Sequence, residues 1–427
     1  MDALATGVET GVELVAQPAR SGRNLTLALL GYYLAVVAVI TIVPFHFVVP
    51  ERLAWARVAT LPDFLANVLM FVPFGFLYRA SRPRLHAGEV WRAVGMGALA
   101  SAVVECIQLF EPARYPTPMD ILANAAGAAL GAMLCQTALR RVHAPAALIG
   151  RLSLQLPLMG LVYLIVPLLW VGSLSVGGSA LRLAMLALPV LFGATLVGFV
   201  QRFHFGPAGA ATAPWMAGAA AAGVLLGAFP ALPLAPLAVL GLAGAAGAVV
   251  LLHAYRSPGV ERRFELPALR SALPFYGTYL VACALAPAIE GDPLGTLGGG
   301  VTLRTVEILR LLHAAAAFTL LGYALAELRG RLELPYRKAA GRIAGWALAV
   351  ALATRLAGNA TLGDASWRTP EEDALWVALT LGGALYGGWL YHLQRAHVCQ
   401  LLTPGSGQAT GSAPPARGSL LPGIPSH

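Results

Sequence analysis

Seven polar side chains lie in or beside apolar stretches of the first third of the chain, where their residue types could support binding or catalysis. They are Asp63, Asn67, Glu105, Gln108, Arg114, Asp120 and Asn124. Ionisable residues inside a membrane span are costly, so they usually face a bundle interior or a water-filled cavity and mark a functional site. The carboxylates could bind cationic or hydroxyl-rich groups, directly or through a divalent ion, or act as a base.

The composition shows what kind of protein carries these residues. Of the 427 residues, 58% are hydrophobic and 11% are charged, whereas about a quarter of the residues of a soluble domain are charged. The net charge is +9, but the basic residues form short clusters between apolar runs, as in the loops that hold the topology of a membrane protein. The sequence therefore predicts a polytopic membrane protein in contact with the lipid bilayer and argues against nucleic-acid binding.

A transmembrane helix needs about 20 mostly apolar residues. Twelve stretches of the chain meet this requirement: 25–43, 63–79, 92–110, 119–139, 154–171, 181–200, 214–230, 232–252, 271–289, 306–327, 339–357 and 373–393. The sequence thus predicts an all-α transmembrane helical bundle of about twelve spans. The pair at 214–252 carries Pro230, Pro233 and Pro236 near its centre, so it forms either two spans or a re-entrant hairpin.

The basic residues also predict the orientation of the spans. Most arginines fall in alternate connecting segments, and if these are cytoplasmic, both termini are cytoplasmic too. Residues 1–24 would form a cytoplasmic tail without an apolar core, so the first span would act as the targeting signal. Residues 401–427 are rich in Pro, Gly and Ser and are predicted to be a disordered tail. The expected location is the bacterial cytoplasmic membrane.

The four cysteines lie in apolar spans or at the end of one and show no Cys-x-x-Cys spacing. They are expected to pack as small apolar side chains, and neither a disulfide framework nor a zinc site is predicted. No cofactor is expected from the sequence.

With this topology, the polar residues gather near the extracytoplasmic ends of the second, third and fourth spans. Asp63 and Asn67 are four residues apart on one helix face, and so are Asp120 and Asn124. A structural alternative stays open, in which Arg114 pairs with one acid and the amides join neighbouring helices. Three acids against one cation nevertheless exceed what a stabilising network needs, which favours a binding site.

The order of these residues resembles a known family. The run DFLANVLMFVPFG at 63–75 is followed by the E-x-x-Q of residues 105–108, by Arg114 and by the D-x-x-x-N-x-x-G of residues 120–127. This succession is similar to the VanZ-like membrane domain. The resemblance implies a four-helix bacterial membrane domain over residues 25–142, linked to the cell envelope and to resistance against glycopeptide antibiotics of the teicoplanin type. It implies no enzymatic reaction.

The last four predicted spans echo the first four. The matched positions are Gly31 with Gly277, Phe71 with Phe318, and Thr117 with Thr369. Because four spans lie between the two sets, both copies would have the same orientation and be related by an axis along the membrane normal. The predicted organisation is the VanZ-like domain, a central segment of about four spans at 150–256, and a degenerate VanZ-like repeat at 270–396.

The predicted repeat reverses the charge of the polar layer. The positions that match Asp63, Glu105 and Asn124 hold Arg310, Arg355 and Trp376. The two arginines could form ion pairs with the acids of the first copy, or hold a phosphate on the opposite wall of a shared cavity. A third alternative is that they extend to the lipid headgroups. Arg310 and Arg355 therefore belong to the predicted ligand-binding set.

Three kinds of function remain open at this point. The first is an envelope protein that binds a lipid-linked sugar or cell-wall precursor in the outward-facing polar layer. The second is a transporter or flippase of such a precursor, since two related halves suit alternating access. The third is a membrane-embedded glycan or lipid transferase that uses Asp63, Glu105 or Asp120 as a base. The chain lacks the large outer loop of polysaccharide ligases and polymerases, which favours binding over catalysis. The oligomeric state stays open.

Overall fold

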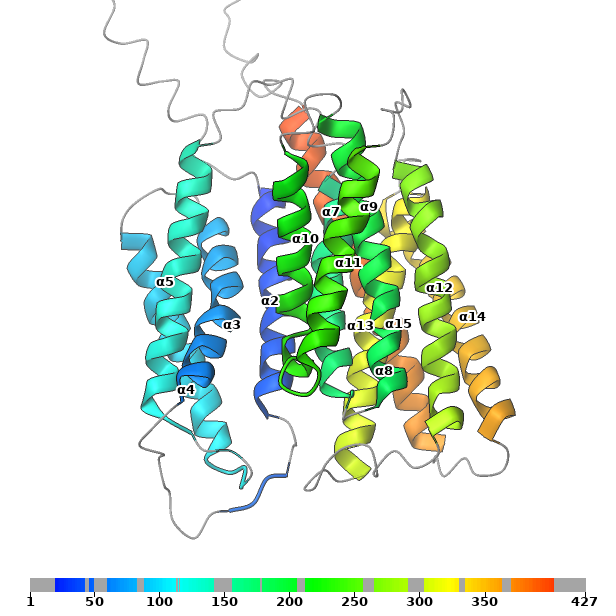
Figure 1. The fold of residues 1–427 in the computed structure, drawn as a ribbon, viewed down its shortest axis with the longest axis horizontal. Coiled ribbons are helices and arrows are strands. Elements are labelled where there is room, and N and C mark those ends of the chain that lie inside the picture. Colours follow the sequence, from blue (N-terminus) through cyan, green and yellow to red (C-terminus); the bar gives the residue numbers. More distant parts are fainter. Residues whose placement is uncertain are drawn as a thin grey trace, which may run out of the picture.

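The computed structural model of the protein describes residues 20–42, 46–49, 60–82, 88–112, 114, 116–141, 156–176, 179–205, 212–255, 265–290, 303–329, 335–362 and 370–402. Within these residues every regular element is a helix, and twelve helices have 15 residues or more. Figure 1 shows the helices side by side, with the chain running up and down between two ends of a bundle.

The long helices are α2 (Arg20–Ile42), α3 (Leu61–Ala80), α4 (Gly88–Gln108), α5 (Pro118–Arg141), α7 (Leu156–Leu174), α9 (Ala187–Phe205), α10 (Ala213–Gly227), α11 (Pro236–Ala254), α12 (Glu265–Glu290), α13 (Leu303–Arg329), α14 (Tyr336–Leu362) and α15 (Pro370–Leu402). Two short elements are the helix α8 (Ala180–Met185) and the 3₁₀ helix η2 (Phe229–Ala231).

Seven segments of the described helices are long and apolar enough to cross a membrane. They fall on α3, α4, α5, α8 together with α9, α11, α13 and α15. The prediction of an all-α membrane bundle is therefore confirmed. The count of twelve spans and the cytoplasmic position of both termini stay predictions, and most of the tails at 1–24 and 401–427 lies outside the described residues.

The pair predicted at 214–252 forms two helices, α10 and α11, which pack against each other and are joined by a turn that contains Pro230 and Pro233. With 15 residues, α10 is about 22 Å long at a rise of 1.5 Å per residue. This is shorter than the ~30 Å hydrocarbon core of a bilayer. Of the two helices, α11 alone has the length of a span.

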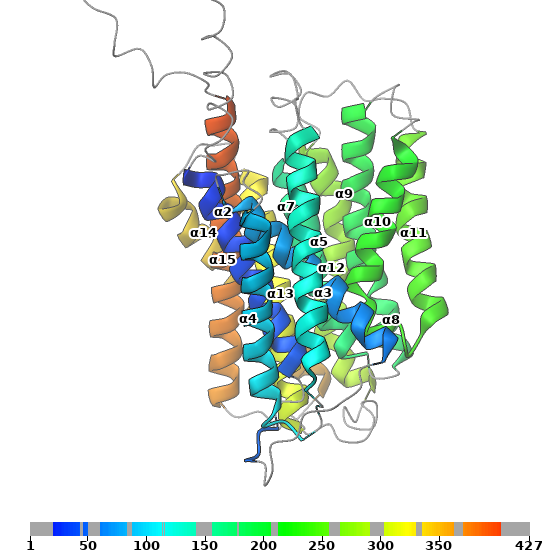
Figure 2. The same ribbon diagram turned by 90° about the vertical axis from the view of Figure 1, so that its left-hand side faces the viewer.

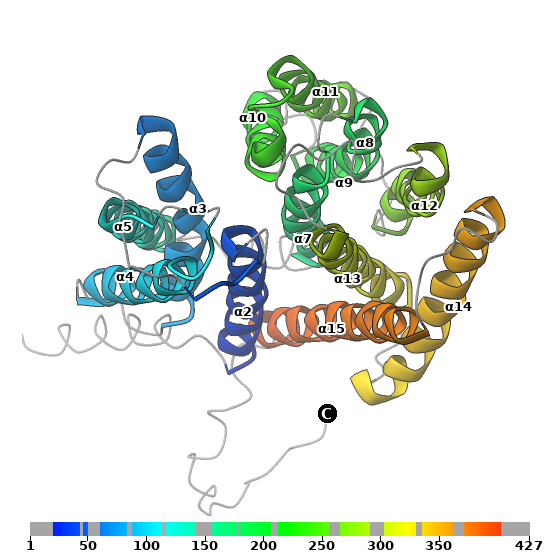
Figure 3. The same cartoon turned by 90° about the horizontal axis from the view of Figure 1, so that it is seen from below.

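Two groups of helices meet where α2 packs against α15 (Figure 3). Helices α3, α4 and α5 lie together at one side of the molecule, nearest the viewer in Figure 2 and at the left in Figure 3. Helix α2 packs against α3 and α4 and also against α7 and α15. Helices α12 and α14 lie at the opposite side (Figure 3). We call α2–α5 the first group and α12–α15 the second group.

Each group is built on a close crossing of two helices at glycines. In the first group, a Cβ added to Gly75 of α3 would overlap the backbone of Ala128, and one added to Gly131 of α5 would overlap the carbonyl of Val72. Small residues let helix backbones approach this closely and gain packing without large side chains. The glycines of the sequence therefore set how α3 crosses α5.

The second group repeats this crossing between α13 and α15. A Cβ on Gly322 would overlap the backbone of Ala384, and one on Gly387 would overlap the carbonyl of Thr319. A tyrosine contact is also shared. Tyr33 of α2 donates to the carbonyl of Met70 in the first group, and Tyr276 of α12 donates to that of Ala317 in the second.

These shared contacts define corresponding positions in the two groups. Gly75 corresponds to Gly322, and Gly131 corresponds to Gly387. Counting along α5 and α15 from this pair, Asp120 corresponds to Trp376 and Asn124 to Thr380. The sequence match had placed Asn124 opposite Trp376, so the contacts shift α15 by about one helical turn. That the groups arose by duplication stays a prediction.

The two ends of the bundle are named after residues of the first group. At the Glu105 end, α4 ends and α5 begins, and the predicted topology makes this end extracytoplasmic. At the Arg79 end, α3 ends and α4 begins. The same topology makes the Arg79 end cytoplasmic.

Candidate functional site

A polar layer at the Glu105 end joins α4 to α5. The Glu105 side chain is buried, and its Oε2 accepts a hydrogen bond of 3.0 Å from the backbone N–H of Thr117. Thr117 in turn caps α5, because its Oγ1 accepts from the backbone N–H of Asp120 at 3.1 Å. The cap thus fixes the start of α5 and places the Asp120 carboxyl group close to Glu105.

Two amides extend this layer across all three helices. Asn67 of α3 donates through Nδ2 to Oδ1 of Asp120 at 2.6 Å. Asn124 of α5 donates through Nδ2 to Oγ of Ser101 on α4 at 2.8 Å. The Oδ1 atom of Asn124 is buried and has no hydrogen-bond partner among the described residues. A buried acceptor of this kind is suited to a ligand that brings a donor.

Carboxyl groups outnumber basic groups in the layer. Asp63 and Glu105 both lie close enough to Asp120 to act on it electrostatically. Arg114, in the turn between α4 and α5, is half-buried with Glu111 and Glu105 as its electrostatic neighbours. Burial lowers the pKa of the Arg114 guanidinium, and the two acids oppose that shift. Arg114 therefore offsets part of the negative charge near Glu105.

Two residues of the predicted set lie at the edge of this layer. Gln108 donates to the backbone carbonyl of Thr41 at 2.7 Å, so it ties α4 to α2. Asp63 is exposed and takes part in the N-terminal cap that Thr60 provides for α3. Five of the seven first-group residues thus meet in one layer, namely Asn67, Glu105, Arg114, Asp120 and Asn124.

Sequence reasoning missed three residues of the layer. Ser101 lies one helical turn before Glu105, and Thr117 begins the pattern T-x-x-D, a helix-capping signature that could have revealed it. Glu111 is 2% exposed, and its Oε2 accepts from the backbone N–H of His46 at 2.5 Å. No sequence signal pointed to Glu111, because its partner comes from a segment 65 residues away.

An apolar groove runs along the other face of α4. Its cavity measures about 650 Å³ and is lined by residues of α4 such as Val103, by Phe110 in the turn after α4 and by the segment 46–49, including Phe47. None of the seven predicted polar residues lines it. The helix α4 therefore separates an apolar groove from the polar layer.

The second group carries different side chains at the corresponding positions. Arg355, which corresponds to Glu105, forms an ion pair with Asp373 of α15, and its guanidinium carbon lies 5.1 Å from the ring centroid of Trp376. Asp373 corresponds to Thr117 and Trp376 to Asp120. The second group therefore closes this end with its own ion pair.

Arg355 of the second group has its partner within its own group. Helix α14 lies at the opposite side of the molecule from α4 (Figure 3), and the ion-pair partner of Arg355 is Asp373. Of the alternatives left open by the sequence, an ion pair between Arg355 and Glu105 is not formed, and the place of Arg310 and Arg355 in a ligand-binding set stays a prediction. Arg310 is half-buried on α13.

Comparison with known proteins identifies the helices that carry the polar layer. A family model described as VanZ/LLP1 matches residues 16–140, which include α2 to α4 and nearly all of α5. Searches of curated proteins and of solved structures found no match. The resemblance read from the sequence is thus confirmed for residues 16–140, under a third of the chain, and the several apolar helices are those of a multi-pass membrane protein.

Proposed function

We propose that the VanZ-like domain binds the polar head of a lipid-linked or glycan-related ligand at the Glu105 end. In this proposal the amine or hydroxyl groups of the head donate to Asp120 and Asn124, and Glu105 adds negative charge behind them. The observation that carries the proposal is the buried Oδ1 of Asn124, which has no partner among the described residues and lies in a layer with two carboxylates.

The balance of donors and acceptors supports a ligand rich in donors. Asn67 already gives its Nδ2 to Asp120, and Asn124 gives its Nδ2 to Ser101. The oxygens of the layer outnumber these donors. Amino sugars and peptide amines supply N–H and O–H groups that would satisfy them, and each such bond to a charged acceptor is stronger than a neutral one.

The apolar groove supports a ligand that also carries a hydrocarbon chain. It lies on the other face of α4 and is lined by apolar side chains, so it can hold part of a prenyl or acyl chain within the bilayer. A lipid-linked precursor of the cell wall combines such a chain with a donor-rich head. A protein that engages this precursor at the outer leaflet would also connect the domain to glycopeptide antibiotics, because those drugs act at the cell wall.

The proposal can be tested with purified protein in lipid nanodiscs. The probes are a prenyl-diphosphate that carries a disaccharide-peptide and the same prenyl-diphosphate without the head. We expect the complete probe to bind more tightly, and Asp120→Asn or Asn124→Leu to weaken its binding at least about tenfold, as the loss of one charged or buried hydrogen bond would.

Glu89→Gln is the control, since it likewise turns an acid of the first group into its amide, but at the Arg79 end. It should bind both probes like the wild type. Equal binding of the two probes by the wild type, or undiminished binding by well-folded Asp120→Asn, would overturn the proposal. Movement of a labelled precursor across vesicles would instead indicate a transporter, and turnover in detergent a transferase.

A further inference from the structure

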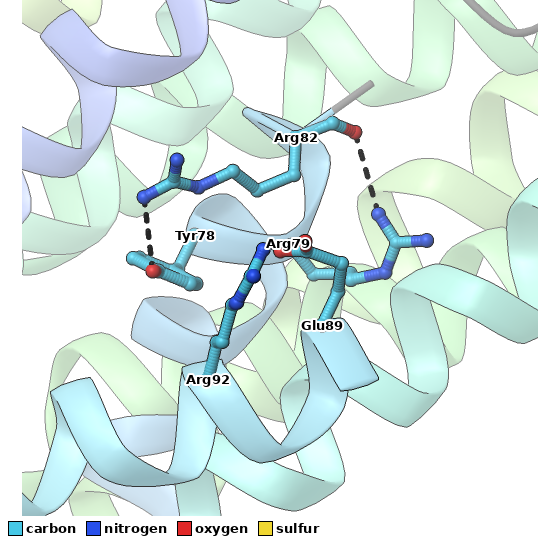
Figure 4. Close-up of polar contacts among 5 residues, drawn as sticks. All are labelled: Tyr78, Arg79, Arg82, Glu89 and Arg92. Carbon is cyan, nitrogen blue, oxygen red and sulfur yellow. Dashed lines mark hydrogen bonds and ion pairs between the residues drawn. The ribbon is translucent and has the colours of Figure 1, made fainter. Parts of the chain in front are cut away.

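The first group carries a second polar cluster at its Arg79 end, in which Arg82 and Arg92 each have a side-chain partner. Arg82 donates through Nη2 to the hydroxyl of Tyr78 at 3.0 Å, and its guanidinium carbon lies 4.9 Å from the Tyr78 ring centroid. Arg92 forms an ion pair with Glu89 one turn earlier on α4. Figure 4 shows these side chains gathered where α3 ends and α4 begins.

Arg79 fills the space inside this cluster. Its side chain is 0% exposed, and its Nη1 donates to the carbonyl of Arg82 at 3.4 Å, while its Nε and Nη2 have no hydrogen-bond partner among the described residues (Figure 4). A large buried side chain at this position leaves no room for another molecule. The first group therefore closes its Arg79 end with its own residues.

The second group keeps the two outer arginines and loses what surrounds them. Counting from Gly75 and Gly322, Arg82 of α3 corresponds to Arg329 of α13. Counting from Glu105 and Arg355, Arg92 of α4 corresponds to Arg342 of α14. The residues that stand at the positions of Tyr78, Arg79 and Glu89 are Leu325, Ala326 and Ala339. Both arginines thus lose their partners, and the side chain that filled the interior is reduced to a methyl group.

A pocket opens at this place. It measures about 310 Å³, and it is lined by Arg329, Arg342, Trp346 and His392 together with apolar side chains such as Ile343. The Nε2 atom of His392 is buried and has no hydrogen-bond partner within the described part of the chain. Among the described residues, no hydrogen bond or ion pair holds Arg329 or Arg342. Two cations and an unpaired ring nitrogen thus surround an empty space.

We propose that this pocket, between α13, α14 and α15, binds the phosphate headgroup of an anionic phospholipid. Guanidinium groups match the geometry of phosphate oxygens and hold them through paired N–H donors. The Nε2 of His392 can contribute a further donor at the base of the pocket when it carries a proton.

The apolar part of the pocket favours a lipid over a free phosphate ion. Trp346 is 60% exposed on α14, and tryptophan is enriched at the level of lipid headgroups. Leu325 and Ile343 line the pocket beside it and can contact the first carbons of the acyl chains. The predicted topology places the Arg79 end in the cytoplasmic leaflet, where anionic lipids attract basic residues. The proposal is independent of the ligand proposed for the Glu105 end.

Lipid retention can be measured by native mass spectrometry on the full chain, extracted into detergent with phosphatidylglycerol or phosphatidylcholine. We expect the wild type to retain more phosphatidylglycerol than phosphatidylcholine. The double variant Arg329→Gln/Arg342→Gln should retain it about thirtyfold less strongly, which corresponds to about 1 kcal/mol for each arginine at a membrane surface. The matched control is Arg82→Gln/Arg92→Gln, which removes the two corresponding charges from the first group and should change retention little.

A second variant tests the pocket without removing its cations. Ala326→Arg/Ala339→Glu restores the residues found at the first-group positions and should fill the space, so that retention falls although Arg329 and Arg342 remain. His392→Leu, which removes the unpaired nitrogen, should lower retention even if that filled variant does not fold.

Three results would overturn the proposal. The first is equal loss of lipid from the Arg82→Gln/Arg92→Gln control, which would mean that surface charge alone holds the lipid. The second is undiminished retention by the Arg329→Gln/Arg342→Gln variant. The third is displacement of the lipid by millimolar inorganic phosphate, which would assign the pocket to a soluble anion.

Discussion

The first and second groups share a backbone arrangement but leave opposite ends open. In the first group, the Glu105 end holds a layer of acids and amides, and the Arg79 end is filled by Arg79 itself. In the second group, the end that corresponds to Glu105 is closed by the ion pair of Arg355 with Asp373, and the other end holds a pocket of about 310 Å³.

This difference shows that helix packing and polar chemistry vary independently in this fold. The glycines at the crossings, such as Gly131 and Gly387, make the same close contacts in both groups. The polar positions between them change type freely, because each change is matched by its neighbours. Glu105 accepts from the backbone N–H of Thr117, whereas Arg355 pairs with the side chain of Asp373, so the same two positions meet in both groups through different atoms.

The largest effect is expected at the crossings, which the two groups have in common. Gly131→Ala and Gly387→Ala each place a Cβ against the backbone of the facing helix, and we expect each to cost about 3 kcal/mol or more of unfolding free energy. Gly95→Ala and Gly345→Ala are the controls, since a Cβ there meets nothing within 4 Å. Denaturant unfolding in detergent would measure all four. A large loss for only one of the two crossing variants would show that the groups do not pack alike.

The next effect concerns the closed end of the second group. Arg355→Glu would place a carboxylate beside Asp373, and we expect a loss of about 2 kcal/mol. The value is below that of a fully buried pair because the Asp373 side chain is 44% exposed. Adding Asp373→Thr removes the repelling carboxylate and gives both positions the residue types of Glu105 and Thr117, so it should restore at least half of the loss. Failure of this rescue in thermal unfolding would argue against the correspondence.

A transplant between the groups should open the Arg79 end of the first group. The triple variant Tyr78→Leu/Arg79→Ala/Glu89→Ala copies the pocket side chains of the second group and leaves Arg82 and Arg92 without their present partners. We expect it to gain about tenfold in retention of phosphatidylglycerol, measured by native mass spectrometry. The single variant Tyr78→Leu, in which Arg79 still fills the interior, should gain nothing. If the triple variant folds and gains no lipid, the charges alone do not make a site.

The smallest effect is expected from relieving repulsion in the polar layer. Asp120→Asn keeps an oxygen that can accept from Asn67 and removes a charge that Asp63 and Glu105 oppose. We expect the free energy of unfolding to rise by about 0.5 kcal/mol. The rise is small because a negative charge near the start of α5 is itself favourable and is lost as well. Glu105→Gln should reduce this gain in a double-mutant cycle. A loss of stability for Asp120→Asn would mean that the layer is structural.

Part of the candidate site could be predicted because its residues are neighbours on single helices. Asp120 and Asn124 lie one turn apart at the start of an apolar run, so their common face follows from the helical period alone. The hydrogen bond of Asn67 to Asp120 confirms that two such faces meet. The roles of Gln108 and Glu111 could not be predicted in this way, since their partners come from α2 and from the segment 46–49.

The amino-acid sequence by itself determined the membrane character, the helical class and the VanZ-like part of the chain. These properties depend on composition and on local spacing, which do not change on folding. It also placed arginines at the Arg79 end of both groups, where Arg82 and Arg329 each follow an apolar run as basic residues beside a span.

Only the tertiary structure decided which of these arginines is satisfied. Arg82 contacts Tyr78, whereas Arg329 faces a pocket with Arg342 and His392. The pocket is formed by side chains of three helices, α13, α14 and α15, whose contact depends on how their glycines let the backbones approach. The order of charged residues along one helix does not show how much space the neighbouring helices leave. The packing between helices therefore distinguishes the pocket of the second group from the filled end of the first.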